Sequence, residues 1–209
     1  MTTDLAPFII YAVDLLLLLI LCRREHGLIT LAVMNMLAVA AFGEYPIHFL
    51  GYTTNAGNPF YAMVMLIISL EARAYQDNGR LFNACNLIFI ALAFRLACGF
   101  YFQPGQNVNL IAASFVAFYL SQFVNFQLLK AEFGMGAVKI IANVIAQAVD
   151  SIFFFSIFML GVPEWKWQDA MVGGFLLKAL LNILDTPVYL WILKRRKVIG
   201  MAATGLASM

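Results

Sequence analysis

Two long apolar stretches near the end of the chain each carry a single row of polar side chains. Each row repeats the spacing i, i+4, i+7: Asn143, Gln147 and Asp150 in the first stretch, and Lys178, Asn182 and Asp185 in the second. On a helix this spacing stacks three side chains on one face. Two such helices in a lipid bilayer should turn their polar rows toward each other or toward a shared cavity. We interpret that cavity as the functional site.

A third apolar stretch adds Gln122 and Asn125 at i, i+3, which again share one helix face. Amide side chains offer a donor and an acceptor together and suit the edge of a flat, neutral heterocycle. A carboxylate can accept two N–H groups from an amidine-like edge. Aromatic side chains could supply a stacking face, and the candidates are Phe153, Phe154, Phe155 and Tyr189.

Five ionisable residues fall inside apolar stretches: Asp14, Arg95, Asp150, Lys178 and Asp185. Each costs a few kcal/mol or more in a bilayer when unpaired. They either mark a substrate or ion pathway or form structural ion pairs, such as Lys178 with Asp150. For the Asp150, Lys178 and Asp185 group we favour the pathway, and for Asp14 and Arg95 the two interpretations stay open.

The composition indicates a membrane protein. Of 209 residues, 63% are hydrophobic and 11% are charged, which is unlike a soluble globular domain. The spacing of the cysteines and histidines does not match a metal site; they are Cys22, Cys85, Cys98, His26 and His48. The chain lacks the phosphate-binding and nucleophile-elbow motifs of ATPases and hydrolases. We therefore expect no metal, no cofactor, no nucleic-acid partner and no enzymatic activity.

The hydrophobic pattern predicts an all-α, polytopic transmembrane bundle with seven spans in one domain, 1–197, followed by a disordered tail, 198–209. The spans are expected at 5–22, 28–42, 59–70, 81–102, 108–129, 137–162 and 169–193. Between the second and third spans, the stretch 51–59 is expected to be a turn leading into a helix N-terminus. Its backbone N–H groups could contact a ligand, or it could be only a turn.

Positive charges fix the expected orientation. With the N-terminus outside, ten of the 13 Lys and Arg residues are cytoplasmic and only Lys166 is external. The ten are Arg23, Arg24, Arg73, Arg80, Lys130, Lys139, Lys194, Arg195, Arg196 and Lys197. The sequence therefore predicts a multi-pass protein of the cell (inner) membrane with its C-terminus in the cytoplasm.

From about residue 30 to residue 197 the chain resembles the queuosine-precursor transporter family, also called the vitamin uptake transporter family. Four places carry the resemblance. They are Thr54-Asn55-Ala56-Gly57, the helix with Ala113-Ser114-Phe115, Gln122 and Asn125, the motif Gln147-Ala148-Val149-Asp150-Ser151, and Lys178 followed by Leu184-Asp185-Thr186-Pro187.

The resemblance implies a six-helix core, 28–193, similar to the substrate-binding subunits of energy-coupling-factor vitamin transporters, with 5–22 as an added helix. It also implies import of a 7-deazaguanine, either 7-cyano-7-deazaguanine or its aminomethyl relative. The family usually has an Asp where Ser69 stands here, with Glu71 two residues on, and another Asp where this chain has Asn125. The predicted substrate-binding residues are Thr54, Asn55, Glu71, Gln122, Asn125, Gln147, Asp150, Lys178, Asn182 and Asp185.

Three other functions stay open. The chain could be a substrate-capture subunit that needs a separate ATP-driven module. It could be a membrane-embedded enzyme, although no His or Cys nucleophile stands beside a base. It could also be a structural assembly in which the charges only pair. The expected partners are a small purine-like molecule and the bilayer, with a homo-oligomer or an energising module as further options.

Overall fold

A computed structural model of the protein describes residues 4–22, 27–42, 45–75, 108–129, 134–158 and 167–195. The predicted span at 81–102, including Arg95, and the tail at 198–209 lie outside these residues. In the described part the chain is mainly helical, as the sequence predicts.

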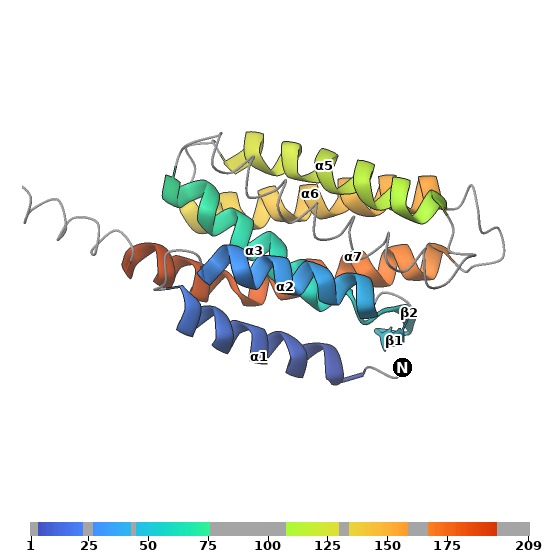
Figure 1. Ribbon diagram of the computed structural model, residues 1–209, viewed down its shortest axis with the longest axis horizontal. Coiled ribbons are helices and arrows are strands. Elements are labelled where there is room, and N and C mark those ends of the chain that lie inside the picture. The colour runs from blue at the N-terminus through green and yellow to red at the C-terminus, as the bar shows by residue number, and fades with distance from the viewer. Residues whose placement is uncertain are drawn as a thin grey trace, which may run out of the picture.

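The helices begin and end within a few residues of the predicted spans. They are α1 (Ala6–Leu21), α2 (Gly27–Phe42), α3 (Asn58–Tyr75), α5 (Val108–Leu129), α6 (Met135–Phe158) and α7 (Trp167–Leu184), and a further helix, Thr186–Arg195, follows α7. Figure 1 shows that most of them run along the long axis of the molecule.

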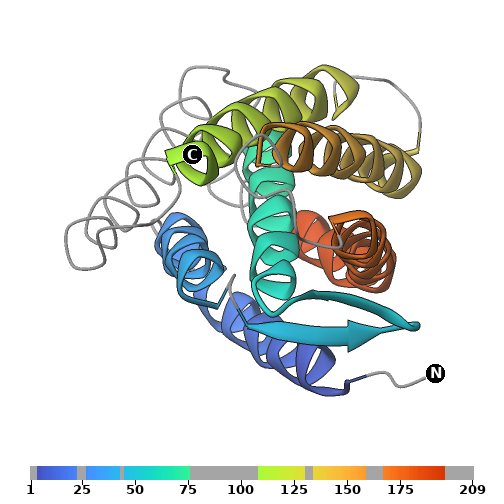
Figure 2. The same ribbon diagram turned by 90° about the vertical axis from the view of Figure 1, so that its right-hand side faces the viewer.

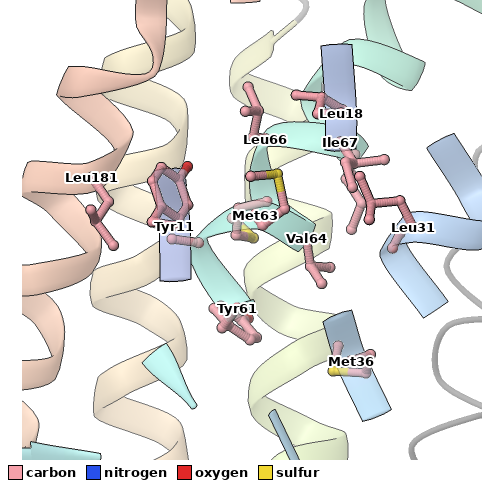
Figure 3. Packing of buried hydrophobic residues seen from close by; sticks show 14 of the residues in the cluster. Tyr11, Leu18, Leu31, Met36, Tyr61, Met63, Val64, Leu66, Ile67 and Leu181 are labelled. Atoms are coloured by element: carbon pink, nitrogen blue, oxygen red, sulfur yellow. The ribbon is translucent and has the colours of Figure 1, made fainter. Parts of the chain in front are cut away.

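Helix α3 is the centre of the bundle. Every residue from Tyr61 to Leu70 is buried, so the helix is covered on all sides. It packs against α1, α2, α5 and α7, and Figure 2, seen along the bundle, shows these helices arranged around it. Figure 3 shows Met63, Val64 and Leu66 of α3 in the same apolar cluster as Leu18 of α1 and Leu31 of α2.

A β-hairpin stands where the sequence predicts only a turn. Strands β1 (Pro46–Phe49) and β2 (Tyr52–Asn55) pair antiparallel, with Phe49 opposite Tyr52. The two residues between them, Leu50 and Gly51, have φ angles of 52° and 87°. Positive φ at both central residues is the geometry of the tight turn that matches strand twist. The described part of the chain therefore contains a two-stranded hairpin that the all-α prediction did not include.

The hairpin is attached to α7 through two glycines. A Cβ on Gly173 would lie 2.7 Å from the Tyr52 Cβ, and one on Gly174 would lie 3.0 Å from the Thr54 Oγ1. Only a residue without a side chain lets the strand approach the helix this closely. The Thr54 hydroxyl, 3.4 Å from the Ala170 carbonyl oxygen, donates a hydrogen bond across the same contact.

The seventh predicted span is not one straight helix. The chain bends by 43° between α7 and the helix Thr186–Arg195, with Asp185 at the break. Pro187 explains the bend, because proline has no N–H to bond the Ile183 carbonyl and its ring clashes with that carbonyl. The backbone bonds from Asp185 N to Leu181 O and from Tyr189 N to Asp185 O, each 3.0 Å, keep the two helices continuous.

The outside of the bundle is apolar and its interior holds polar groups. Exposed large side chains include Ile9 and Leu16 of α1, Phe123 of α5 and Ile152 of α6. Among the described residues one helix, Met135–Ile157, is long and apolar enough to cross a membrane by itself. The bent pair that begins with α7 makes a second candidate if it counts as one span.

The contact between the hairpin and α7 makes a first prediction. Gly173→Ala should destabilise the protein by about 1–3 kcal/mol, because the new methyl group overlaps the Tyr52 Cβ. Thermal unfolding in detergent measures the effect. Gly134→Ala is the matched control, since a Cβ there meets no atom within 4 Å. Equal melting temperatures for the two variants would contradict the packing described.

Candidate functional site

The two polar rows of α6 and α7 face each other, as the sequence predicts. Asp150 pairs with Lys178, and the Asn143 amide donates to the Asn182 side-chain oxygen at 3.0 Å. Asp185, at the end of α7, is bonded to Lys139 of α6. Residue numbers rise along α6 as those of their partners fall along α7, so the helices are antiparallel. The rows therefore form one polar seam inside the bundle.

The first part of this seam is an ion pair supported by hydroxyl groups, which we call the Asp150 cluster. The Lys178 ammonium donates to one Asp150 oxygen at 3.0 Å and to the Ser151 hydroxyl at 3.4 Å. The Tyr61 hydroxyl donates to the other Asp150 oxygen at 2.8 Å and lies 3.3 Å from the Ser121 hydroxyl. The charges balance, and the carboxylate keeps lone pairs for a further donor.

An aromatic ring completes the Asp150 cluster. The Lys178 Nζ lies 4.8 Å from the centre of the Tyr61 ring, within cation–π range. Tyr61 was not among the predicted site residues, because it stands one turn into α3 within the apolar run 60–68. The stacking candidates lie differently: Phe154 and Phe155 pack edge to face, and Phe153 is 41% exposed.

Three buried amides follow the Asp150 cluster: Gln122 and Asn125 on α5, and Gln147 on α6. They are 2%, 0% and 0% exposed. The Gln122 nitrogen contacts the Met65 sulfur at 2.8 Å. The Gln122 oxygen and both polar atoms of Asn125 and of Gln147 have no hydrogen-bond partner within the described residues. Buried amide atoms normally are bonded, so these five atoms are available to a ligand or to water.

Gln147 lies between the two ion pairs along α6. Gln147 follows Asn143 by one turn of α6 and precedes Asp150 by three residues. The Asn143 oxygen accepts a hydrogen bond from the Ser69 hydroxyl at 2.9 Å. The Asn182 amide reaches the Ile140 carbonyl oxygen at 3.4 Å. The contacts of Asn143 and Asn182 therefore lie between Gln147 and the second ion pair along α6.

The second ion pair corrects the expected place of Lys139. The charge count treats Lys139, two residues into the predicted span 137–162, as a cytoplasmic charge. It is instead fully buried within α6. Its ammonium donates to the Asp185 carboxylate, to the Asn182 carbonyl oxygen at 2.6 Å and to the Thr186 hydroxyl at 3.4 Å. Together with Tyr11, whose hydroxyl donates to Asp185 at 2.5 Å, these residues form the Lys139 cluster.

The other predicted site residues have local roles or lie apart. Thr54 accepts a hydrogen bond from the Asn58 amide at 2.7 Å, and the Asn55 side-chain oxygen accepts one from the Gly57 N–H at 3.1 Å. Both therefore shape the entry into α3. Glu71 and Asp14 are buried on α3 and α1. Contact of Thr54, Asn55 or Glu71 with a ligand stays a prediction.

The predicted substrate residues thus fall into separate groups. Gln122, Asn125, Gln147, Asp150 and Lys178 belong to the Asp150 cluster and the amides beside it. Asn182 and Asp185 are engaged in the contacts with Asn143 and Lys139. In the described part of the chain, no group of three His, Cys, Asp or Glu side chains could hold a metal ion.

A comparison with models of protein families shows to which family the chain belongs. The family model described as "Putative vitamin uptake transporter" matches residues 52–192. The chain belongs to this family. All four motifs that carry the resemblance lie inside the matched range, whereas α1, α2 and β1 lie before it.

No curated protein and no solved structure matches the chain. Family membership assigns this vitamin uptake transporter to a membrane and gives it a small-molecule substrate. It agrees with the expectation that the chain is a transporter and not an enzyme.

The Asp150 cluster makes a second prediction. Lys178→Met should destabilise the protein by about 3 kcal/mol, because Asp150 would lose its only described counter-charge in a low-dielectric interior. Thermal unfolding in detergent is the measurement. The double variant Asp150→Leu, Lys178→Met should regain most of the loss, since it leaves no unpaired charge. A double variant no more stable than Lys178→Met would contradict the pairing.

Proposed function

We propose that this vitamin uptake transporter imports a small, planar, purine-like compound, most specifically a 7-deazaguanine precursor of queuosine. The observation that carries the proposal is the set of five buried amide atoms without partners on Gln122, Asn125 and Gln147, next to the Asp150–Lys178 pair. The four family motifs support the substrate class, because three of them supply these residues.

The proposed membrane arrangement is a single domain of seven spans with the N-terminus outside. The apolar exterior and the buried charges of the described helices support it, because this distribution suits a lipid environment. Without Lys139, nine basic residues remain on the proposed cytoplasmic side against one outside. The resemblance supports a core similar to substrate-binding subunits of vitamin transporters.

Recognition of the heterocycle would use the polar groups in complementary ways. Asp150 accepts from the two N–H groups on the guanine-like edge, using lone pairs that Tyr61 and Lys178 leave. The amides of Gln122, Asn125 and Gln147 pair with the remaining donors and acceptors of the ring. The Tyr61 ring, beside Lys178, offers an aromatic surface to a planar ligand.

The charge balance of the cluster favours a neutral ligand. Asp150 and Lys178 already compensate each other, and a further charge would enter a poorly hydrated site without a counter-ion. Of the two queuosine precursors, the neutral 7-cyano compound therefore fits better than the cationic aminomethyl compound.

A panel of ligands provides the third prediction. 7-cyano-7-deazaguanine should raise the melting temperature of the purified protein more than its aminomethyl relative does, and adenine should have no effect, because its edge lacks the N–H pair that Asp150 accepts. Differential scanning fluorimetry in detergent measures the shifts, since a ligand stabilises the state that it binds. Uptake by liposomes that contain only this chain then tests transport without an ATP-driven module.

A protein that responds equally to adenine and to 7-deazaguanines would contradict the proposed edge recognition. Binding without uptake by the chain alone would instead favour the substrate-capture alternative.

A fourth prediction tests the amides. Gln147→Leu should weaken binding of the stabilising ligand about tenfold or more, the effect of losing one or two hydrogen bonds. It should not lower the melting temperature of the ligand-free protein, because the removed atoms have no described partner. Asn35→Leu is the matched control: Asn35 is also a buried amide with an unpartnered oxygen, but it lies on α2.

Titration calorimetry gives the affinities of both variants. Equal loss of affinity in the Asn35 and Gln147 variants would contradict a binding role specific to the seam.

A further inference from the structure

The Lys139 ammonium is surrounded by oxygen atoms of three kinds. They are a carboxylate oxygen of Asp185, the main-chain carbonyl oxygen of Asn182 at 2.6 Å and the Thr186 hydroxyl at 3.4 Å. Lys139 is 0%, Asp185 1% and Asn182 2% exposed. One nitrogen therefore sits in a small, buried, oxygen-lined site at the meeting point of α6 and α7.

The site lies where the helix is interrupted. Asp185 stands at the 43° bend between α7 and the helix Thr186–Arg195. The last carbonyl groups of a helix carry partial negative charge and attract cations. Pro187 cannot donate to the Ile183 carbonyl, so the break also frees backbone acceptors. In transporters, interrupted helices with such carbonyls coordinate Na⁺ or protons.

The oxygen atoms match what a small monovalent cation needs. A carboxylate, a carbonyl and a hydroxyl are hard ligands, and together they carry one negative charge. A lysine ammonium is a compact, singly charged group that can take the place of such an ion. It is held here on a four-carbon chain from α6, so it cannot leave.

We propose that the Lys139 cluster is an alkali-cation site whose ion is replaced by the tethered Lys139 ammonium. The intact protein therefore binds no free Na⁺ at this break, and removal of the ammonium converts the cluster into a Na⁺ site. The inference goes beyond substrate recognition, and it depends on neither the ligand nor the direction of transport.

Helix α1 completes the cluster from outside the matched family range. The Tyr11 hydroxyl donates to the second Asp185 oxygen at 2.5 Å, so both oxygens of this carboxylate have a partner. Tyr189 covers another side, with the Lys139 Nζ 5.9 Å from its ring centre. Tyr11 thereby holds Asp185 in position after Lys139 is shortened.

Lys178, the other buried lysine, differs from Lys139 in its hydrogen-bond partners and in its distance from the helix break. Among the described residues, Lys178 donates hydrogen bonds to side-chain oxygens of Asp150 and Ser151, and it lies within the unbroken part of α7. It has no helix break beside it. Lys178→Met also unbalances a buried carboxylate, so it is the matched control for a variant that exposes Asp185.

The experiment, our fifth prediction, compares melting temperatures of the full chain in detergent without substrate. Chloride salts of Na⁺, K⁺ and Li⁺ are compared with choline chloride at constant ionic strength. Lys139→Met should show a saturable rise of about 5 °C in at least one alkali salt. The unaltered protein, Lys178→Met and the double variant Lys139→Met, Asp185→Asn should show no difference between the alkali salts and choline.

The proposal is overturned if Lys139→Met melts at the same temperature in all four salts, or if the unaltered protein responds to an alkali ion. Should Lys139→Met not survive purification in choline, its monodisperse yield is measured after extraction in each salt. Monodisperse Lys139→Met protein in an alkali salt supports the proposal. If the double variant folds and Lys139→Met gives no monodisperse protein in any alkali salt, the proposal is overturned. Because no substrate is present, failure here leaves the proposed ligand untouched, and failure of the ligand panel leaves this result untouched.

Discussion

The structure depends on pairing buried charges across α6 and α7. Among the described residues, two lysine–carboxylate pairs, Lys139–Asp185 and Lys178–Asp150, lie inside a bundle whose exposed side chains are largely apolar. In each pair the lysine and the carboxylate come from opposite sides of the α6–α7 contact. An unpaired charge in such an interior costs several kcal/mol. Because the partners are spaced along two antiparallel helices, the two ion pairs fix the register of α6 against α7.

The remaining elements support this seam. Helix α3 supplies Tyr61, Met65 and Ser69 at intervals of one turn, and each of them contacts a different level of the seam. Helix α5 adds Gln122 and Asn125, and α1 adds Tyr11. The hairpin fixes the start of α3 against α7 through the glycines at 173 and 174. A layered arrangement results along α6, with ion pairs at two levels and the unpartnered Gln147 amide between them.

The two levels differ chemically, and this difference favours the two roles proposed for them. At the Asp150 cluster the partners are side chains and a ring, beside amides with polar atoms that have no partner among the described residues. At the Lys139 cluster the partners include a main-chain carbonyl at a helix break, and both oxygens of the carboxylate are engaged. A site that must bind and release a substrate needs available donors and acceptors, whereas a saturated site suits a fixed cation.

The sequence by itself determined the helices and the polar rows, because both depend on local periodicity. Local spacing predicts the bounds of α1, α2, α5 and α6 and the facing polar rows. The cost of a charge in an apolar stretch predicts the Asp150–Lys178 pair, which the sequence analysis gave as the structural alternative. Only the tertiary structure decided which distant residues meet. Tyr61 reaches Asp150 across 89 positions and Tyr11 reaches Asp185 across 174. From the sequence, Lys139 is predicted to be an interfacial charge. The structure shows it paired with Asp185, 46 residues later in the chain. Such contacts depend on how whole helices pack together, and a local pattern carries no information about that.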